Sequence, residues 1–184
     1  MIVKNSVKVR IVELSPAECP VQLENNYLSH SYYDVRLWRE KDSWKAELIK
    51  KTFSEPFKKT FKSRFYESFV EEPRVFAAKV DEQQVGWIEL GYQKWNNTMR
   101  VWEFLFKEEY RRRLIGTLLM NQAVKIAKEK DARMLVLETQ SCNSSAIDFY
   151  LKYGFELIGF DTVAYSNSDI EKKEVRLEMG LKLK

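Results

Sequence analysis

The residues best suited to bind a ligand lie where a predicted strand meets a predicted helix. The apolar segment Phe104, Leu105 and Phe106 is followed closely by a basic turn and then by the predicted start of a helix. The residues of this turn and helix start are Arg111, Arg112, Arg113, Leu114, Ile115, Gly116 and Thr117. The first turn of a helix leaves main-chain N–H groups without intrahelical partners and carries partial positive charge. Arginine side chains beside those donors suit a pyrophosphate, whose oxygens can approach the main chain closely at Gly116 and Thr117. The alternative interpretation is a solvated basic turn that binds nothing.

A strand before this turn and a helix after it must hold it in place. Alternation over residues 99–106 predicts a strand, and apolar residues at helical spacing predict a helix from about residue 115 to 130. The short apolar run 134–139 is typical of a buried strand. Strand, helix and strand together predict a βαβ crossover.

The C-terminal part of the chain continues this pattern. Asn143 or Ser144 caps a short helix that runs to about Lys152, and Gly154 provides its C-terminal stop. Two more strands are expected over residues 155–158 and 175–183.

The N-terminal part combines strands with a segment of helical appearance. Residues 8–14 alternate like a strand, and residues 75–80 and 85–91 flank a polar turn, which predicts a hairpin. The segment 34–69 is predicted to be helical because phenylalanines recur every four residues along one stripe: Phe57, Phe61, Phe65 and Phe69. The stripe faces either the core or a substrate pocket.

Composition excludes several kinds of protein. The 184 residues suit one domain, and the formal charge of +4 falls short of a nucleic-acid-binding arm. Two cysteines and one histidine make a disulfide framework, a zinc centre or a Ser-His-Asp triad improbable. No apolar run approaches the roughly 18–20 residues of a membrane span. We therefore expect a cytoplasmic domain that binds neither a metal, nor nucleic acid, nor a membrane.

Two groups of residues resemble the GNAT superfamily of N-acetyltransferases. Tyr110-Arg111 and Gly116 after a strand resemble its acetyl-CoA signature, with Leu114 in the place of the first glycine. The downstream pattern resembles the streptothricin acetyltransferase form of the superfamily. It comprises Leu137–Gln140, Asn143, Ala146, Phe149-Tyr150 and Gly154-Phe155, with support from Trp95-Asn96, Asp161, Tyr165 and Glu174.

The resemblance implies a single GNAT domain over residues 1–184. Its fold would be α+β, with a mixed six- to seven-stranded sheet that splays at its centre and about four flanking helices. Residues of about 27–72 would form a helical substrate-side segment, and about 99–155 the acetyl-CoA-binding core. Acetyl-CoA would lie on these residues: Phe104, Leu105, Phe106, Arg111, Arg112, Arg113, Leu114, Ile115, Gly116, Thr117, Asn143 and Tyr150. We expect Leu114 to have helical dihedral angles, which would make leucine tolerable there.

The reaction implied by the resemblance is direct acyl transfer to an amine. Tyr150 matches the family tyrosine that faces the sulfur, and we assign it as general acid. For the general base we choose Glu103, whose side chain should lie on the opposite face of the strand from Trp102 and Phe104. Glu138 is the second candidate. Packing for Tyr150 and structural ion pairs for the two glutamates are the alternative roles.

Several functions remain open at this stage. The leading hypothesis is acetylation of a primary amine of a small molecule, with a streptothricin-like antibiotic as candidate and antibiotic resistance as the consequence. Acetylation of a protein N-terminus or lysine is the alternative within the class, and a non-catalytic acyl-CoA-binding module is the alternative outside it. The alternating last strand leaves a homodimer as an option.

Overall fold

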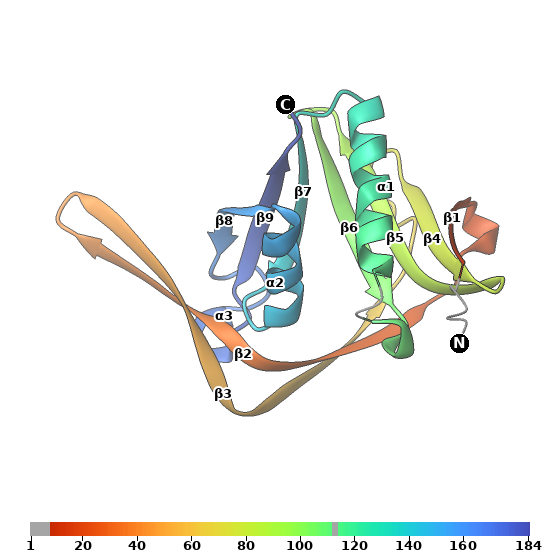
Figure 1. Ribbon diagram of the computed structural model, residues 1–184. Coiled ribbons are helices and arrows are strands. Elements are labelled where there is room, and N and C mark those ends of the chain that lie inside the picture. Colours follow the sequence, from red (N-terminus) through yellow and green to blue (C-terminus); the bar gives the residue numbers. More distant parts are fainter. Residues whose placement is uncertain (1–7, 112–113) are drawn as a thin grey trace, which may run out of the picture. The chain divides into compact units, whose positions relative to one another are not determined.

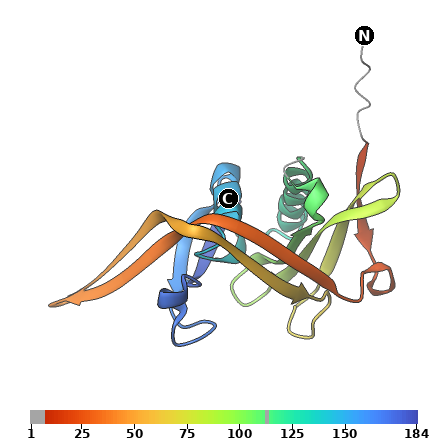
Figure 2. The same ribbon diagram turned by 90° about the horizontal axis from the view of Figure 1, so that it is seen from below.

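The computed structural model describes residues 8–111 and 114–184 (Figures 1 and 2). Nine strands, three α-helices and two short 3₁₀ turns occur within these ranges. The strands are β1 (Val9–Leu14), β2 (Leu23–Glu40), β3 (Ser43–Ser63), β4 (Arg74–Val80), β5 (Gln83–Gln93), β6 (Thr98–Phe106), β7 (Met134–Gln140), β8 (Glu156–Asp161) and β9 (Arg176–Lys182). The helices are α1 (Ile115–Glu129), α2 (Ser144–Tyr153) and α3 (Asp169–Lys172), and the 3₁₀ turns are Pro16–Glu18 and Glu108–Tyr110.

Seven strands form one mixed sheet in the order β1-β4-β5-β6-β7-β9-β8, and β2 pairs with β3 separately. The chain divides into two compact units. The first contains residues 1–25, 62–135 and 182–184, and the second contains residues 26–61 and 136–181. None of the helices within the described ranges is long and apolar enough to cross a membrane.

The first unit is an antiparallel sheet covered by α1. Strands β1, β4, β5 and β6 pair in sequence order along the sheet. One face carries a buried cluster of five side chains: Leu14, Val75, Ala77, Trp87 and Leu105. Helix α1 packs against β4 and β5 (Figure 1) through residues at helical spacing: Ile115, Leu119, Met120, Ala123, Ile126 and Ala127. Because both faces of this sheet are buried, the sheet holds the turn between β6 and α1 in a fixed position.

The second unit contains α2, α3 and the last strands of the sheet. Strands β8 and β9 pair antiparallel, with a register shift between Leu157 and Gly159. Helix α2 ends at Gly154, whose φ of 113° is the left-handed conformation that favours glycine. The Ser141 N–H donates to the Val175 carbonyl at 2.8 Å, which ties the end of β7 to the start of the last strand.

The predicted helical segment over about 27–72 is wrong. Residues 23–40 and 43–63 form the long hairpin β2–β3, which turns at Lys41 with a φ of 48° (Figure 1). A spacing of four places phenylalanines on one side of a strand as well as of a helix, because the strand period is two. Phe53 and Phe57 accordingly lie on the same side of β3, with ring centroids 5.4 Å apart.

The other predicted elements are confirmed within a few residues at their ends. The strand at 8–14, the hairpin strands, the βαβ crossover and the capped helix α2 are all present. The described ranges contain three α-helices where about four were expected, and α3 was not predicted.

Candidate functional site

The turn from β6 into α1 presents main-chain donors, as expected. The Leu118 N–H makes the first α-helical hydrogen bond, to the Leu114 carbonyl at 3.0 Å. The N–H groups of Ile115, Gly116 and Thr117 therefore precede the hydrogen-bonded turn of the helix. A leucine side chain at the N-cap cannot accept from them. This geometry leaves three consecutive donors and the positive end of the helix for an anion.

Leu114 itself differs from the expectation. Its φ of 50° and ψ of −9° lie in the left-handed region, so the predicted helical dihedral angles are wrong. The residue is 79% exposed, whereas the neighbouring Ile115 is buried and anchors the start of α1. A residue with a Cβ is strained in this region and glycine is not. Leu114, at the position of the first glycine in the acetyl-CoA signature, thus has the left-handed backbone conformation that favours glycine.

The basic residues of the turn are described only in part. Arg112 and Arg113 lie outside the described residues. Arg111 follows the 3₁₀ turn, and its N–H donates to the Glu108 carbonyl at 3.2 Å. Contact of the three arginines with a pyrophosphate therefore stays a prediction.

The end of β6 is fixed on one side by β5. Phe104, Leu105 and Phe106 pair with Ile88, Trp87 and Gly86, in that order. A Cβ at Gly86 would come within 2.8 Å of the Phe106 ring, so glycine is what allows the ring to lie there. The Phe104 and Phe106 rings meet edge to face at 4.7 Å. The main chain at these three residues is thus held rigidly, and its pairing with a pantetheine arm stays a prediction.

A β-bulge in β6 places Glu103 differently from the expectation. Glu103 pairs with Glu89, whereas Val101 pairs with Leu90, so Trp102 is an extra residue. A Cβ at Gly91 would lie 2.6 Å from the indole nitrogen of Trp102. Gly91 and Glu89 share one face of β5, and the Trp102 ring covers that face. Trp102 and Glu103 therefore lie on the same face, and the predicted opposition of these two side chains is wrong.

In the second unit, Asn143 begins α2 as expected. Its Oδ1 accepts from the Ala146 N–H at 3.4 Å, which is the N-cap bond. The next residue, Ser144, is buried, and its hydroxyl lies 3.0 Å from that of Ser29 on β2. The cap role of Asn143 is confirmed, and a bond from it to coenzyme stays a prediction.

Tyr150 lies on the buried face of α2. Its side chain packs among aromatic rings, with centroid distances of 5.7 Å to Phe149 and 5.8 Å to Phe155. It is 7% exposed, so both packing and a catalytic role remain compatible with its position.

Glu138 is engaged by two neighbours. The Tyr165 hydroxyl donates to it at 3.1 Å, and the Arg176 guanidinium lies 3.0 Å from its other oxygen. Burial raises the pKa of Tyr165, so the hydroxyl keeps its proton and remains a donor. These contacts suit a structural carboxylate better than a base that must accept a proton.

Sequence reasoning did not identify a polar group at the base of the hairpin. The Tyr27 hydroxyl lies 3.1 Å from Gln140 Oε1 and 3.2 Å from Cys142 Sγ. Lys59 Nζ lies 2.6 Å from Glu174. Burial raises the pKa of both the Tyr27 hydroxyl and the Cys142 thiol, so the thiol is a poor nucleophile. No sequence signal marked Tyr27, because its strand was taken for a helix.

A second group around Asp34 was also missed. Its carboxylate lies 2.6 Å from Lys51 and 3.0 Å from Lys173, and 3.4 Å from Arg36. The two lysines hold the pKa of Asp34 at about 2. The group joins both strands of the hairpin to the end of α3.

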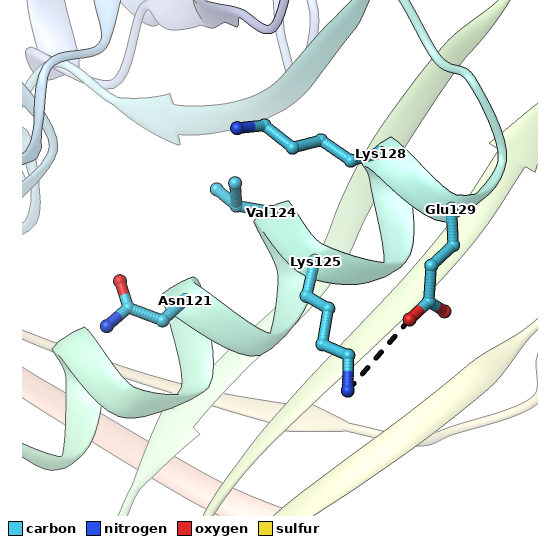
Figure 3. Close-up of a pocket in the computed structure, with 5 residues that line it drawn as sticks. All are labelled: Asn121, Val124, Lys125, Lys128 and Glu129. Atoms are coloured by element: carbon cyan, nitrogen blue, oxygen red, sulfur yellow. Dashed lines mark ion pairs between the residues drawn. The ribbon is translucent and has the colours of Figure 1, made fainter.

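A hollow lies on the outer face of α1 (Figure 3). Asn121, Val124, Lys125, Lys128 and Glu129 line it, and Lys125 pairs with Glu129 at 3.9 Å. These residues come from one helix, beyond its N-terminal donors, and we assign no chemistry to them.

Known proteins are similar to this chain in both sequence and fold. The chain matches the acetyltransferase (GNAT) family over residues 42–155. Streptothricin acetyltransferase A of Bacillus subtilis (strain 168) is 33% identical over 118 residues, which are 62% of this chain and 68% of that protein. The crystal structure of nourseothricin acetyltransferase has a TM-score of 0.76 at 25% identity, over 96% of this chain and 99% of that one.

A further structure shows the same fold. It is a candidate streptothricin acetyltransferase from Bacillus anthracis str. Ames in complex with acetyl coenzyme A, with a TM-score of 0.76 at 24% identity. The match covers 98% of this chain and 100% of that chain. The expected mixed α+β fold is thereby confirmed. The family match extends over more than half of the sequence and agrees with the strand order and the donor-bearing turn, so the chain belongs to the GNAT family of N-acetyltransferases.

Proposed function

We propose that this enzyme transfers the acetyl group of acetyl-CoA to a primary amine of a small molecule of the streptothricin class. The observation that carries the proposal is the similarity to streptothricin acetyltransferase A and to nourseothricin acetyltransferase. The similarity to nourseothricin acetyltransferase covers 96% of this chain. The same proposal places the enzyme in the cytoplasm, where acetyl-CoA is available.

The turn between β6 and α1 fits the phosphates of the coenzyme. Its three main-chain donors, at Ile115, Gly116 and Thr117, are the groups that a pyrophosphate needs, and the helix dipole adds to the attraction. Arg111, Arg112 and Arg113 would neutralise charge at the same turn. The main chain at Phe104–Phe106 would pair with the pantetheine arm as an added strand, and Asn143 would contribute from the start of α2.

Two residues would handle protons during the reaction. An alkyl ammonium must lose a proton before its nitrogen attacks the thioester, and Glu103 would accept that proton. Tyr150 would donate a proton to the departing thiolate. Glu103 is the first candidate for this base, and Glu138, which binds Tyr165 and Arg176, is the second.

The hairpin offers groups for a cationic, polar acceptor. Tyr32, Phe53 and Phe57 form a row of rings, with centroid distances of 4.5 Å and 5.4 Å. Aromatic faces attract cationic amines. The last strand, β9, lies between β7 and β8 in the sheet and is not a free edge, so it cannot be the pairing edge expected for a homodimer. Toward the tip of the hairpin, Trp38 and Trp44 are exposed, and we offer this part of the hairpin as the dimer surface instead. Light scattering of the purified protein at several concentrations decides between monomer and dimer.

A thiol-release assay tests the proposed function. The enzyme is incubated with acetyl-CoA and each of three acceptors: a streptothricin, an aminoglycoside, and a peptide with a free N-terminus. The proposal predicts turnover with the streptothricin. Turnover with the peptide alone would favour a protein acetyltransferase, and tight acetyl-CoA binding without release would favour an acyl-CoA-binding module.

A further inference from the structure

The turn between β7 and α2 is tied to strand β2 at both of its ends. The turn begins at Gln140, and the Asn143 N–H closes it by donating to the Gln140 carbonyl at 2.8 Å. At the first end, the Tyr27 hydroxyl donates to Gln140 Oε1 at 3.1 Å. At the second end, the Ser29 hydroxyl lies 3.0 Å from that of Ser144, the first residue of α2. Because Tyr27 and Ser29 are two positions apart in β2, they project from the same side of the strand.

The Ser29 hydroxyl uses all of its hydrogen-bonding capacity, which is one donor and two acceptor positions. Its O–H donates to the Ser31 carbonyl at 3.2 Å, and its oxygen accepts from the Ser144 N–H at 3.2 Å. Since its one proton goes to Ser31, the 3.0 Å contact is the Ser144 hydroxyl donating to Ser29. Ser29 is 0% exposed and Ser144 is 4% exposed, so water cannot replace a lost partner. Ser29 therefore fixes both the N–H and the hydroxyl of the first residue of α2.

The Tyr27 hydroxyl holds the turn in a similar way. Burial raises the pKa of Tyr27, so the hydroxyl keeps its proton and donates it to Gln140. With that proton used, the 3.2 Å contact with Cys142 is the thiol donating to the tyrosine oxygen. Leu28, between Tyr27 and Ser29, is half exposed. The side of β2 that carries Tyr27 and Ser29 is thus the side that faces the turn.

Asn143 lies between two of these anchored residues, Cys142 and Ser144. Its Oδ1 accepts the Ala146 N–H, so its amide nitrogen is the atom that can donate to a ligand. A hydrogen bond weakens steeply when donor and acceptor are misaligned. The contacts that fix Cys142 and Ser144 therefore also fix the direction in which the Asn143 amide can bond.

We propose that Ser29 and Tyr27 are positioning residues for acetyl-CoA: they hold the turn 140–144 so that the Asn143 amide points toward the coenzyme. The proposal rests on the proposed function, in which Asn143 contributes to coenzyme binding. Strand β2 belongs to the hairpin that carries the rings offered for the acceptor. The hairpin thus serves the coenzyme as well as the acceptor.

Calorimetry of acetyl-CoA binding tests the proposal. Ser29→Ala removes the bonds to Ser144 and should weaken binding about three- to tenfold, which corresponds to the loss of one hydrogen bond to the coenzyme. Tyr27→Phe keeps the ring and should act in the same direction, and it supplies the test if Ser29→Ala does not fold. The matched control is Ser54→Ala, which removes a hydroxyl from an exposed serine of β3 and should leave the affinity unchanged. Unchanged affinity in either folded test variant would overturn the proposal.

A double variant tests whether Ser29 acts through Asn143. In the Asn143→Ala background, Ser29→Ala should cause no further loss of acetyl-CoA affinity, because residues that act as one unit are not additive. A further loss as large as in the unmodified protein would overturn the proposal. The KM for acetyl-CoA should rise in Ser29→Ala by the same factor as the calorimetric Kd. A purely structural role of Ser29 would lower Tm and leave the affinity of the folded protein unchanged.

The outcomes separate this inference from the proposed function. Weaker binding in Asn143→Ala with unchanged binding in Ser29→Ala and Tyr27→Phe would reject the inference alone. Unchanged binding in Asn143→Ala would reject the proposed contact of Asn143 with the coenzyme, and the inference with it. Because calorimetry needs no acceptor, a failure to acetylate a streptothricin would reject the proposed acceptor and leave this inference standing.

Discussion

The strained backbone at Leu114 leads to a quantitative prediction. Left-handed backbone costs a residue that carries a Cβ about 1–2 kcal/mol. Glycine avoids this cost but loses about 0.5–1 kcal/mol more backbone entropy on folding. With 79% of Leu114 exposed, the leucine side chain adds few contacts that could offset the strain. Leu114→Gly should therefore raise the free energy of unfolding by about 0.5–1 kcal/mol, the difference between these magnitudes.

The matched control is Leu114→Ala, which removes the side chain but keeps the Cβ and its strain. For a chain of this size, 1 kcal/mol shifts Tm by roughly 2–4 °C. By thermal unfolding, Leu114→Gly should melt about 1–4 °C above Leu114→Ala, and Leu114→Ala close to the unmodified protein.

The same variants report on the coenzyme site. Glycine keeps the three N–H donors of the turn and removes the Cβ beside them, so calorimetry should show acetyl-CoA binding to Leu114→Gly at least as tightly as to the unmodified protein. A Leu114→Gly variant that melts below Leu114→Ala would refute the left-handed conformation. Weaker coenzyme binding by Leu114→Gly alone would show that the leucine side chain itself contacts the ligand.

Three further predictions concern the second unit. Asp34→Asn should lower the free energy of unfolding by about 1 kcal/mol at pH 7. Because the folded pKa of Asp34, about 2, is below its unfolded value, this stabilisation is present above about pH 4 and is lost as the pH falls toward 2. The stability of Asp34→Asn should therefore depend less on pH in that range than the stability of the unmodified protein, and equal pH dependence would exclude the ion pairs. Tyr150→Phe should lower kcat by about 10²–10⁴-fold without changing acetyl-CoA affinity, whereas equal turnover would leave Tyr150 a packing residue. Asn143→Ala should destabilise the protein by about 1 kcal/mol in chemical unfolding, and Asn143→Ser should restore most of that loss if the cap bond is its cause.

Local signals made much of the fold predictable. The turn at Gly154, the cap at Asn143 and the apolar run of β7 each depend on neighbours in sequence, and the structure confirms all three. The donor-bearing start of α1 was predictable for the same reason, because strand, turn and helix follow one another directly.

The hairpin was not predictable from the same kind of signal. Phenylalanines at a spacing of four satisfy both the helical and the strand period. Pro56 looked like a helix start, yet it lies within β3, where a two-stranded ribbon leaves room for a residue without an N–H. Strands of 18 and 21 residues also exceed the usual length of about 5–6, which biased the interpretation toward a helix.

Two details of the site depend on pairing between distant residues. The bulge at Trp102 exists only in the register between β5 and β6, and it turns Trp102 onto the face of Glu103. The pairing of Glu89 with Glu103 has the same origin. Alternation along a single strand cannot reveal either feature, since both arise from the partner strand.

Mass spectrometry of the acceptor tests the central claim most directly. A streptothricin is incubated with the enzyme and acetyl-CoA while free thiol is followed in the same sample. The account predicts an acceptor heavier by one acetyl group on an amine nitrogen, with one thiol released for each acetyl transferred. An unmodified acceptor in a sample where the folded protein binds acetyl-CoA would contradict it.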